Sequence, residues 1–376
     1  MEIKLLVLYR KKLKNKVIIF FMIRVYSWLV KNATGKRQYH VWKTGRKSMF
    51  LCVVGDSSWG ILPGLWNWKE GGEESPHLYA ARGAEIFLGR FPPLEESLTR
   101  EILFPFLFAR GALLETGFPA FIVRSGSWKI PEVPFIEMGG TSPEYPLSLK
   151  EEEKRFNRAL QLGREIGKFT DRLVLGNCVP GGALGSLLLL RGLGCEDEEE
   201  LLSDVPDLCS QRDLLWKDFS SKTGVLAGGL QENPWEALLL SGDPSLSVLA
   251  GIAAGVPRSC SVVLAGDLSM LGVGAFLRFR KIRRSLLLDL FPSRDEKIRL
   301  QRGRIAKSLQ LGYREIASGE LERIEKIFSK NDEKDLMGMA GVLRYAEDLG
   351  VSREAVFRRA RDLYDLFLGI PEKRGF

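Results

Sequence analysis

The segment DRLVLGNCVPGGALGSLLLLRGLG, residues 171–194, decides the fold class. A short apolar run leads into a glycine-rich loop, and a helical pattern follows that stops at another glycine. Residues 258–280, RSCSVVLAGDLSMLGVGAFLRFR, repeat this order. Strands separated by helices in this way predict an α/β protein. We expect a mostly parallel Rossmann-like sheet with helices on both faces, plus a smaller helical subdomain.

The segments upstream of this unit continue the pattern. Three short apolar runs predict strands: FLCVVG (50–55), AEIFLG (84–89) and FPAFIV (118–123). Two stretches with helical periodicity predict helices: 97–117 and 148–169. The Pro-rich stretch at 129–146 is the best candidate for a linker or binding loop, and residues from about 280 to 376 are expected to be mainly helical.

The first 48 residues differ from the rest of the chain. They hold 13 Lys and Arg against one acid, Glu2, whereas the other 328 residues hold 42 basic and 46 acidic side chains. The apolar run at 17–30 is interrupted by Arg24 and is shorter than the roughly 20 residues of a membrane span. We therefore predict a basic extension (1–48), a main α/β domain (49–376) and no stable membrane span. The extension is either unnecessary for the fold or a basic membrane-surface anchor.

The charge of the main domain argues against nucleic-acid binding, because the net charge of +8 comes from the extension. Residues 349–364 resemble the recognition half of a helix-turn-helix and leave DNA binding as a minor alternative, although Ser352 is also an ordinary helix start.

Cysteine and histidine usage favours a cytoplasmic protein without a metal or cofactor. The five cysteines are scattered, no Cys-x-x-Cys pair occurs, and the two histidines are His40 and His77. A zinc site needs three or four such ligands, usually in paired spacing. The cysteines are expected to be buried thiols in a reducing compartment. A Ser-His or Cys-His nucleophile has only His77 as a possible base outside the extension.

Three glycine loops are the candidate binding sites. In parallel α/β sheets, ligands bind outside the carboxyl ends of the strands, where glycines and helix N-termini can hold phosphate. The loops at 176–182 and 265–267 have that position, and the stretch 241–255 adds Gly242 and Asp243. Taken alone, such a loop is more often an ordinary strand-to-helix turn than a phosphate site. Asp243 and Asp267 could be acid/base groups or helix N-caps, and capping is the more frequent use of such residues.

The order of these motifs resembles the nicotinate-nucleotide–dimethylbenzimidazole phosphoribosyltransferase-like family, especially its archaeal-type branch. The resemblance covers residues from about 50 to 368. It rests on these motifs: FLCVV, ILPGL (61–65), AEIFLG, SLTR (97–100), KIPEVPFIEMG, LVLGNCVPGG, ALGSLLLLRGLG, SGDPSLSVLAGIA, VVLAGDLSM and MGMAGVL (337–343).

The resemblance implies a pentosyltransferase of cobalamin lower-ligand synthesis that moves phosphoribose from nicotinate mononucleotide to a benzimidazole-type base. It implies small-molecule substrates, no metal and a homodimer. The general base would correspond to Asp335, where the family has Glu. The phosphate and nucleotide would be bound by these residues: Gly176, Pro180, Gly181, Gly182, Ser186, Gly266 and Asp267. Gly242 and Asp243 would form a loop for the base or ribose.

The chain departs from the family pattern at these sites. Ala183, Leu184 and Gly185 replace a run of threonines, and Pro244 stands where lysine is common. A non-catalytic relative that binds a nucleotide or base therefore remains the alternative function.

Overall fold

The computed structural model describes residues 48–60, 76–91, 100–139, 147–195, 206–290, 296–315 and 339–367. The chain divides into two compact units, Met1–His40 and Val41–Phe376. The first unit lies outside the described residues, so the prediction for the extension stays a prediction. All that follows concerns the second unit.

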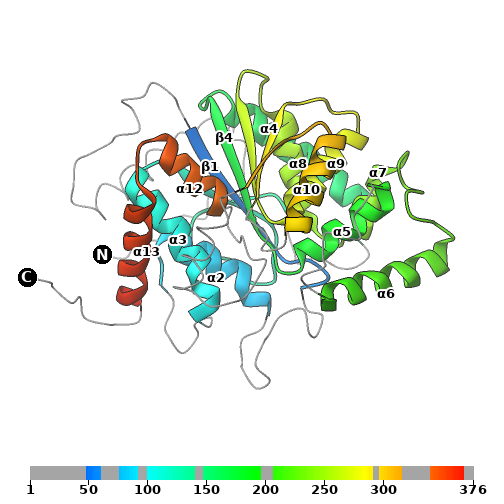
Figure 1. Cartoon of the computed structure of the whole chain (residues 1–376), viewed down its shortest axis with the longest axis horizontal. Coiled ribbons are helices and arrows are strands. Elements are labelled where there is room, and N and C mark those ends of the chain that lie inside the picture. The colour runs from blue at the N-terminus through cyan, green and yellow to red at the C-terminus, as the bar shows by residue number, and fades with distance from the viewer. Residues whose placement is uncertain are drawn as a thin grey trace, which may run out of the picture. The chain divides into compact units, whose positions relative to one another are not determined.

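The described strands form one parallel sheet (Figure 1). They are β1 (Ser48–Gly55), β2 (Ala120–Gly126), β3 (Phe135–Glu137), β4 (Arg172–Cys178), β5 (Ser261–Gly266), β6 (Leu286–Leu290) and β7 (Gly312–Glu315). Their order is β3-β2-β1-β4-β5-β6-β7, and each neighbouring pair is parallel. The predicted Rossmann-like parallel sheet is confirmed.

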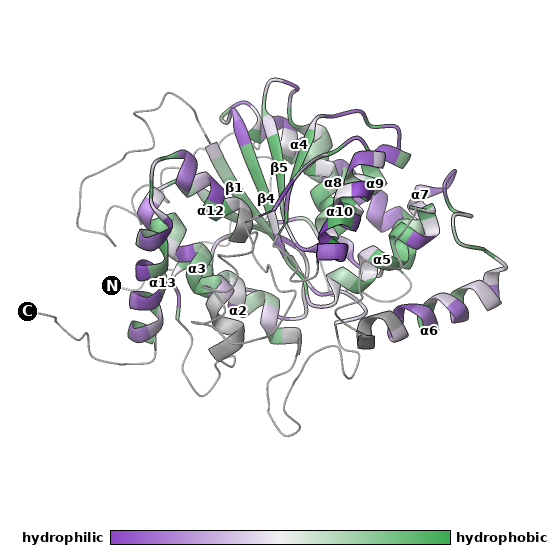
Figure 2. Ribbon diagram, viewed as in Figure 1, coloured by the Kyte–Doolittle hydropathy of each residue, from purple (hydrophilic) through white to green (hydrophobic). Residues whose placement is uncertain are grey.

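Helices cover both faces of this sheet (Figure 1). One layer contains α2 (Pro76–Leu88), α3 (Arg100–Thr116), α12 (Met339–Asp348) and α13 (Arg353–Phe367). The other contains α4 (Leu149–Ile166), α5 (Gly182–Leu193), α7 (Pro234–Leu240), α8 (Pro244–Gly255), α9 (Leu268–Phe279) and α10 (Glu296–Ser308), with α6 (Pro206–Thr223) packed on α5. Because both faces are covered, β1 is buried along its whole length. Figure 2 shows the central strands as largely hydrophobic and α13 with many hydrophilic residues.

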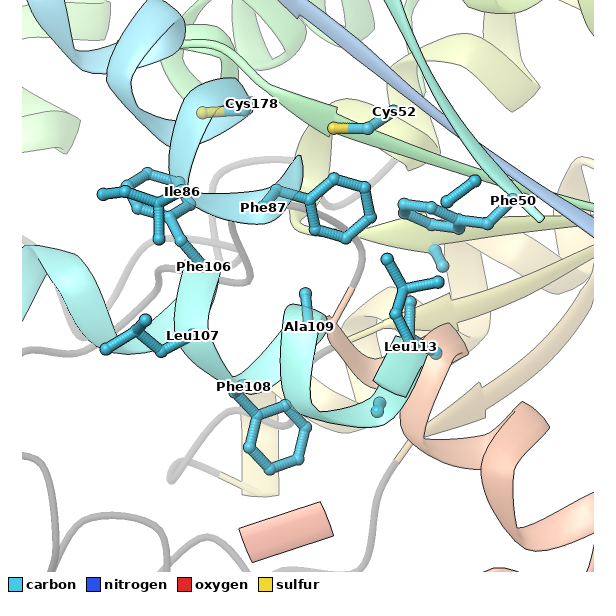
Figure 3. Close-up of a cluster of buried hydrophobic side chains, with 14 of the residues drawn as sticks. Phe50, Cys52, Ile86, Phe87, Phe106, Leu107, Phe108, Ala109, Leu113 and Cys178 are labelled. Carbon is cyan, nitrogen blue, oxygen red and sulfur yellow. The ribbon is translucent and has the colours of Figure 1, made fainter. Parts of the chain in front are cut away.

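Alternate side chains of β1 point into the two layers. Phe50 and Cys52 belong to the core against α2 and α3, where the Phe50 ring lies 5.5 Å from that of Phe87 (Figure 3). On the other face, α4 and α8 approach each other closely through glycines. A Cβ on Gly251 would lie 2.4 Å from the carbonyl oxygen of Phe156. Only glycine permits this separation of the two helices.

One expectation about secondary structure needs correction. Residues 84–89 are not a strand, because AEIFLG forms the end of α2, where Ala84, Ile86 and Phe87 are buried. A short apolar run cannot by itself distinguish a buried strand from the buried side of a helix. From about residue 280 onward the described residues are mainly helical, and they also contribute β6 and β7. The Pro-rich stretch likewise contains a short strand, β3.

The basic C-terminal helix, α13, is tied to the rest of the domain. Arg359 pairs with Glu115 of α3 at 2.8 Å, and Arg353 pairs with Glu347. The backbone N–H of Ala355 donates to the Ser352 hydroxyl, so Ser352 is the helix start expected from the sequence. No helix among the described residues is both long enough and apolar enough to span a membrane.

Candidate functional site

The strand order places the topological switch point between β1 and β4. From β1 the chain goes on to α2 and α3 in one layer, and from β4 it goes on to α5 in the other. In open parallel sheets, ligands bind outside the carboxyl ends of the strands at this point. The relevant residues are therefore those that follow Gly55 and Cys178.

Hydrogen bonds tie three loops together at this edge. The Ser57 hydroxyl donates to the carbonyl oxygen of Pro180 at 2.5 Å. The Ser58 N–H donates to the carbonyl oxygen of Gly242 at 2.8 Å. The indole N–H of Trp59 donates to the carbonyl oxygen of Ser241 at 2.6 Å. The structure thus brings Pro180 and Gly242, both predicted from the sequence, to the loop that follows β1.

The glycines of the first loop are packed against this neighbourhood. Gly181 has φ +74°, and a Cβ there would lie 2.6 Å from the backbone nitrogen of Gly60. A Cβ on Gly182 would lie 3.2 Å from Oδ2 of Asp243. Gly181, Gly182 and Asp243 therefore share one site.

Two carboxylates cap neighbouring helices. Oδ1 of Asp243 accepts the N–H of Ser245 at the start of α8, and Oδ1 of Asp267 accepts the N–H of Ser269 at the start of α9, both at 2.8 Å. The capping interpretation is confirmed for both residues. The helix α5 begins after Gly181 without a side-chain cap. Of these three helix starts, α5 alone has no carboxylate cap.

The other predicted residues lie farther into the structure. Gly176 is inside β4 opposite Cys52. A Cβ on Gly266 would lie 3.0 Å from Oδ1 of Asn177. Ser186 is fully buried and faces α9, because a Cβ on Gly272 would meet its hydroxyl at 2.6 Å. Asp335 lies outside the described residues.

Unpartnered polar atoms gather at the same edge. Among the described residues, these buried atoms have no hydrogen-bond partner: Oδ1 of Asp56, Oγ of Ser58, Oδ1 of Asn177, Oδ2 of Asp243 and Oγ of Ser245. Folded proteins rarely leave buried polar atoms unpaired, so a cluster of them suggests a place that receives a ligand or water.

The carboxyl groups at this edge have raised pKa values. Burial raises the pKa of Asp56 to about 7, against the opposing effects of the Trp128 N–H and of Arg124. Burial also raises the pKa of Asp243 to about 6, with a smaller contribution in the same direction from Asp267. The pKa of Asp267 is raised by burial too. Such groups are frequent at functional sites.

The sequence analysis did not identify Asp56 and its neighbours. A single acid directly after the first apolar strand carries little local information, although its position at a strand end could have drawn attention. A separate surface pocket of about 470 Å³ is lined by Arg191, Arg212, Trp216 and neighbouring residues of α6. It lies at the far end of α5 from Gly182 and contains no predicted site residue.

Comparison with known protein sequences finds similarity to proteins named UPF0284, a name that states no activity. No family model matches the chain. It is 26% identical over 333 residues to the UPF0284 protein of Pyrococcus furiosus, covering 85% of this chain and 98% of that protein. It is 28% identical to the UPF0284 protein of Crocosphaera subtropica, where the match spans 61% of this chain and only 65% of the relative.

A solved structure is also similar to the chain. It is the nicotinate-nucleotide–dimethylbenzimidazole phosphoribosyltransferase from Thermus thermophilus, with a TM-score of 0.48 and 16% identity over 88% of this chain and 87% of that one. The chain is thus similar to the UPF0284 proteins, and its motif order resembles that of the nicotinate-nucleotide–dimethylbenzimidazole phosphoribosyltransferase-like family.

Proposed function

We propose that this chain transfers phosphoribose from nicotinate mononucleotide to a benzimidazole-type base. The motif order supports the reaction type. The observation that carries the proposal is the meeting of an uncapped helix start, Gly181–Gly182, with the unpartnered carboxylate oxygen of Asp243 at the switch point.

The 5′-phosphate would bind at the start of α5. Helix N-termini attract anions through their unpaired N–H groups and the helix dipole. At α8 and α9 the carboxylates of Asp243 and Asp267 already occupy that place, and a second anion there would be repelled. Gly181 and Gly182 are therefore better candidates for phosphate than Gly266 and Asp267.

The ribose would lie beside Asp243, next to the start of α5. The carboxylate of Asp243 is close to Gly182 and can accept hydrogen bonds from sugar hydroxyls. Since Oδ1 of Asp243 is used by the helix cap, Oδ2 is the atom available to a hydroxyl. This gives Gly242 and Asp243 the ribose role.

Calorimetry with nicotinate mononucleotide tests the site. The Gly182→Val change places bulk against Asp243 and should abolish binding. Gly182→Ala is the graded comparison, because its single Cβ makes a tight contact of 3.2 Å with Oδ2 of Asp243 and should weaken binding less than valine does. Equal binding by all three proteins would place the nucleotide elsewhere.

A non-catalytic relative is the second candidate. The observation that favours it is Ser186, the first hydroxyl after the glycines, which faces α9 instead of the loop. Such a protein would bind nicotinate mononucleotide but release no nicotinate when dimethylbenzimidazole is added. Release of nicotinate would exclude it.

A further inference from the structure

Asp56 is a buried carboxyl group at the switch point that uses only one of its two oxygens in a hydrogen bond with the described residues. It directly follows Gly55, the last residue of β1, and is only 4% exposed. Its Oδ2 accepts the backbone N–H of Trp128 at 2.6 Å. Its Oδ1 has no hydrogen-bond partner among the described residues. The group is thus fixed in position by one bond, while the other oxygen is a buried acceptor without a partner among the described residues.

The nearby arginine does not neutralise this carboxyl group directly. The Arg124 guanidinium donates to Glu137 at 2.6 Å and to the side chain and carbonyl of Ser127. It acts on Asp56 through its charge, and among the described residues the thiol of Cys178 also interacts electrostatically with Asp56. A carboxyl group without an ion-pair partner remains able to exchange a proton near neutral pH.

The loop that binds Asp56 through its backbone also exposes apolar residues. Trp128, whose backbone N–H binds the carboxyl group, is 54% exposed, and Ile130, two residues further on, is 56% exposed. Exposed aromatic and aliphatic residues on the loop that holds this acceptor suit a flat heteroaromatic ring that carries an N–H.

We propose that Asp56 is the general base of the reaction and accepts the N–H proton of the benzimidazole acceptor at Oδ1. This inference rests on the proposed function. One ring nitrogen of the acceptor attacks C1′ of the ribose and forms the new C–N bond. The bond from C1′ to the pyridinium nitrogen breaks, its electron pair neutralises that nitrogen, and nicotinate leaves. The acceptor ring, now cationic, becomes neutral when its other nitrogen gives its proton to Asp56.

The other carboxylates of this edge are less suitable. Asp243 and Asp267 are committed to helix caps, and the spare oxygen of Asp243 lies beside Gly182, where the ribose is proposed. The family pattern assigns the general-base role to Asp335 instead, so one experiment compares Asp56 with Asp335.

The test uses two acceptors that differ in a single proton. Dimethylbenzimidazole has an N–H, whereas its 1-methyl analogue can still attack C1′ but has no proton to give. Asp56→Asn should slow nicotinate release with dimethylbenzimidazole by at least about 100-fold and leave the rate with the methylated analogue unchanged. The fall in the wild-type rate below about pH 7, where Asp56 becomes protonated, should also disappear in the variant.

The outcomes separate the two proposals. Equal slowing with both acceptors would mean that Asp56 is only structural, and a selective loss in Asp335→Asn instead of Asp56→Asn would assign the base to Asp335. If the wild type releases no nicotinate with either acceptor, the proposed transfer fails. In that case, fluorescence titration with dimethylbenzimidazole tests separately whether the acceptor binds at Asp56. Tight wild-type binding that Asp56→Asn weakens would uphold the acceptor site, and no difference would overturn it.

Discussion

The stability of the wild type should depend on pH in a way that Asp56→Asn does not share. The pKa of Asp56 is raised from 3.8 to about 7 in the folded chain. The folded protein therefore holds this proton more tightly than the unfolded chain, and stability falls as the pH rises from about 4 to about 7. The whole change corresponds to about 4 kcal/mol of unfolding free energy. Asparagine carries no charge and its side-chain oxygen can still accept the Trp128 N–H, so the variant escapes this loss.

Urea denaturation followed by tryptophan fluorescence at pH 4.5, 6, 7 and 8.5 measures the effect. The difference in unfolding free energy between Asp56→Asn and wild type should be small at the lowest pH, grow in favour of the variant, and level off above pH 7. Glu152 and Asp243 are also buried with raised pKa values, but they are present in both proteins and cancel in the difference. Asp218→Asn on α6 is the control, because its exposed pair with Lys222 contributes only a few tenths of a kcal/mol at any pH. A flat difference across this range would refute the reasoning that Asp56 is desolvated in the folded chain.

Two further predictions concern packing and the extension. Gly251→Ala should destabilise the chain by about 1–3 kcal/mol, because its Cβ meets the carbonyl oxygen of Phe156 at 2.4 Å. Gly303→Ala in α10 is the control: its Cβ makes only ordinary contacts at 3.6 Å, so the change should stabilise the chain slightly. Chemical denaturation of both variants measures this, and equal stability would show that α4 and α8 can separate without cost. A chain that begins at Met49 should unfold within a degree or two of the full chain, since only Ser48 of β1 is removed; a large drop in melting temperature would show that residues before Ser48 stabilise the fold.

The sequence predicted best those elements whose beginning and end are marked by local sequence signals. The units around β4–α5 and β5–α9 were recognisable because an apolar run, a glycine loop and a glycine stop occur together. AEIFLG lacked such a context, and its six residues fit a strand as well as the end of α2. The strand β7 is short and partly exposed, so it has no apolar run to reveal it.

The site was predictable in part. Its glycine loops could be proposed from their positions after strands, and the structure brings Gly181, Gly182 and Asp243 together. Asp56 could not be singled out, because its significance comes from the unpartnered Oδ1 and from the bond to Trp128, which is 72 positions away in the chain. Such properties arise only when distant loops meet.

The central position of β1 also has a consequence for synthesis of the chain. This strand is made before the other described elements, yet its two neighbours are β2 and β4, and Phe50 pairs with Val174 about 120 residues later. Until β4 has left the ribosome, this mostly apolar strand has no partner on one edge. During that interval the nascent chain offers a template for wrong pairing. We therefore expect chaperone binding to be strongest on ribosome-bound chains that end between β2 and β4.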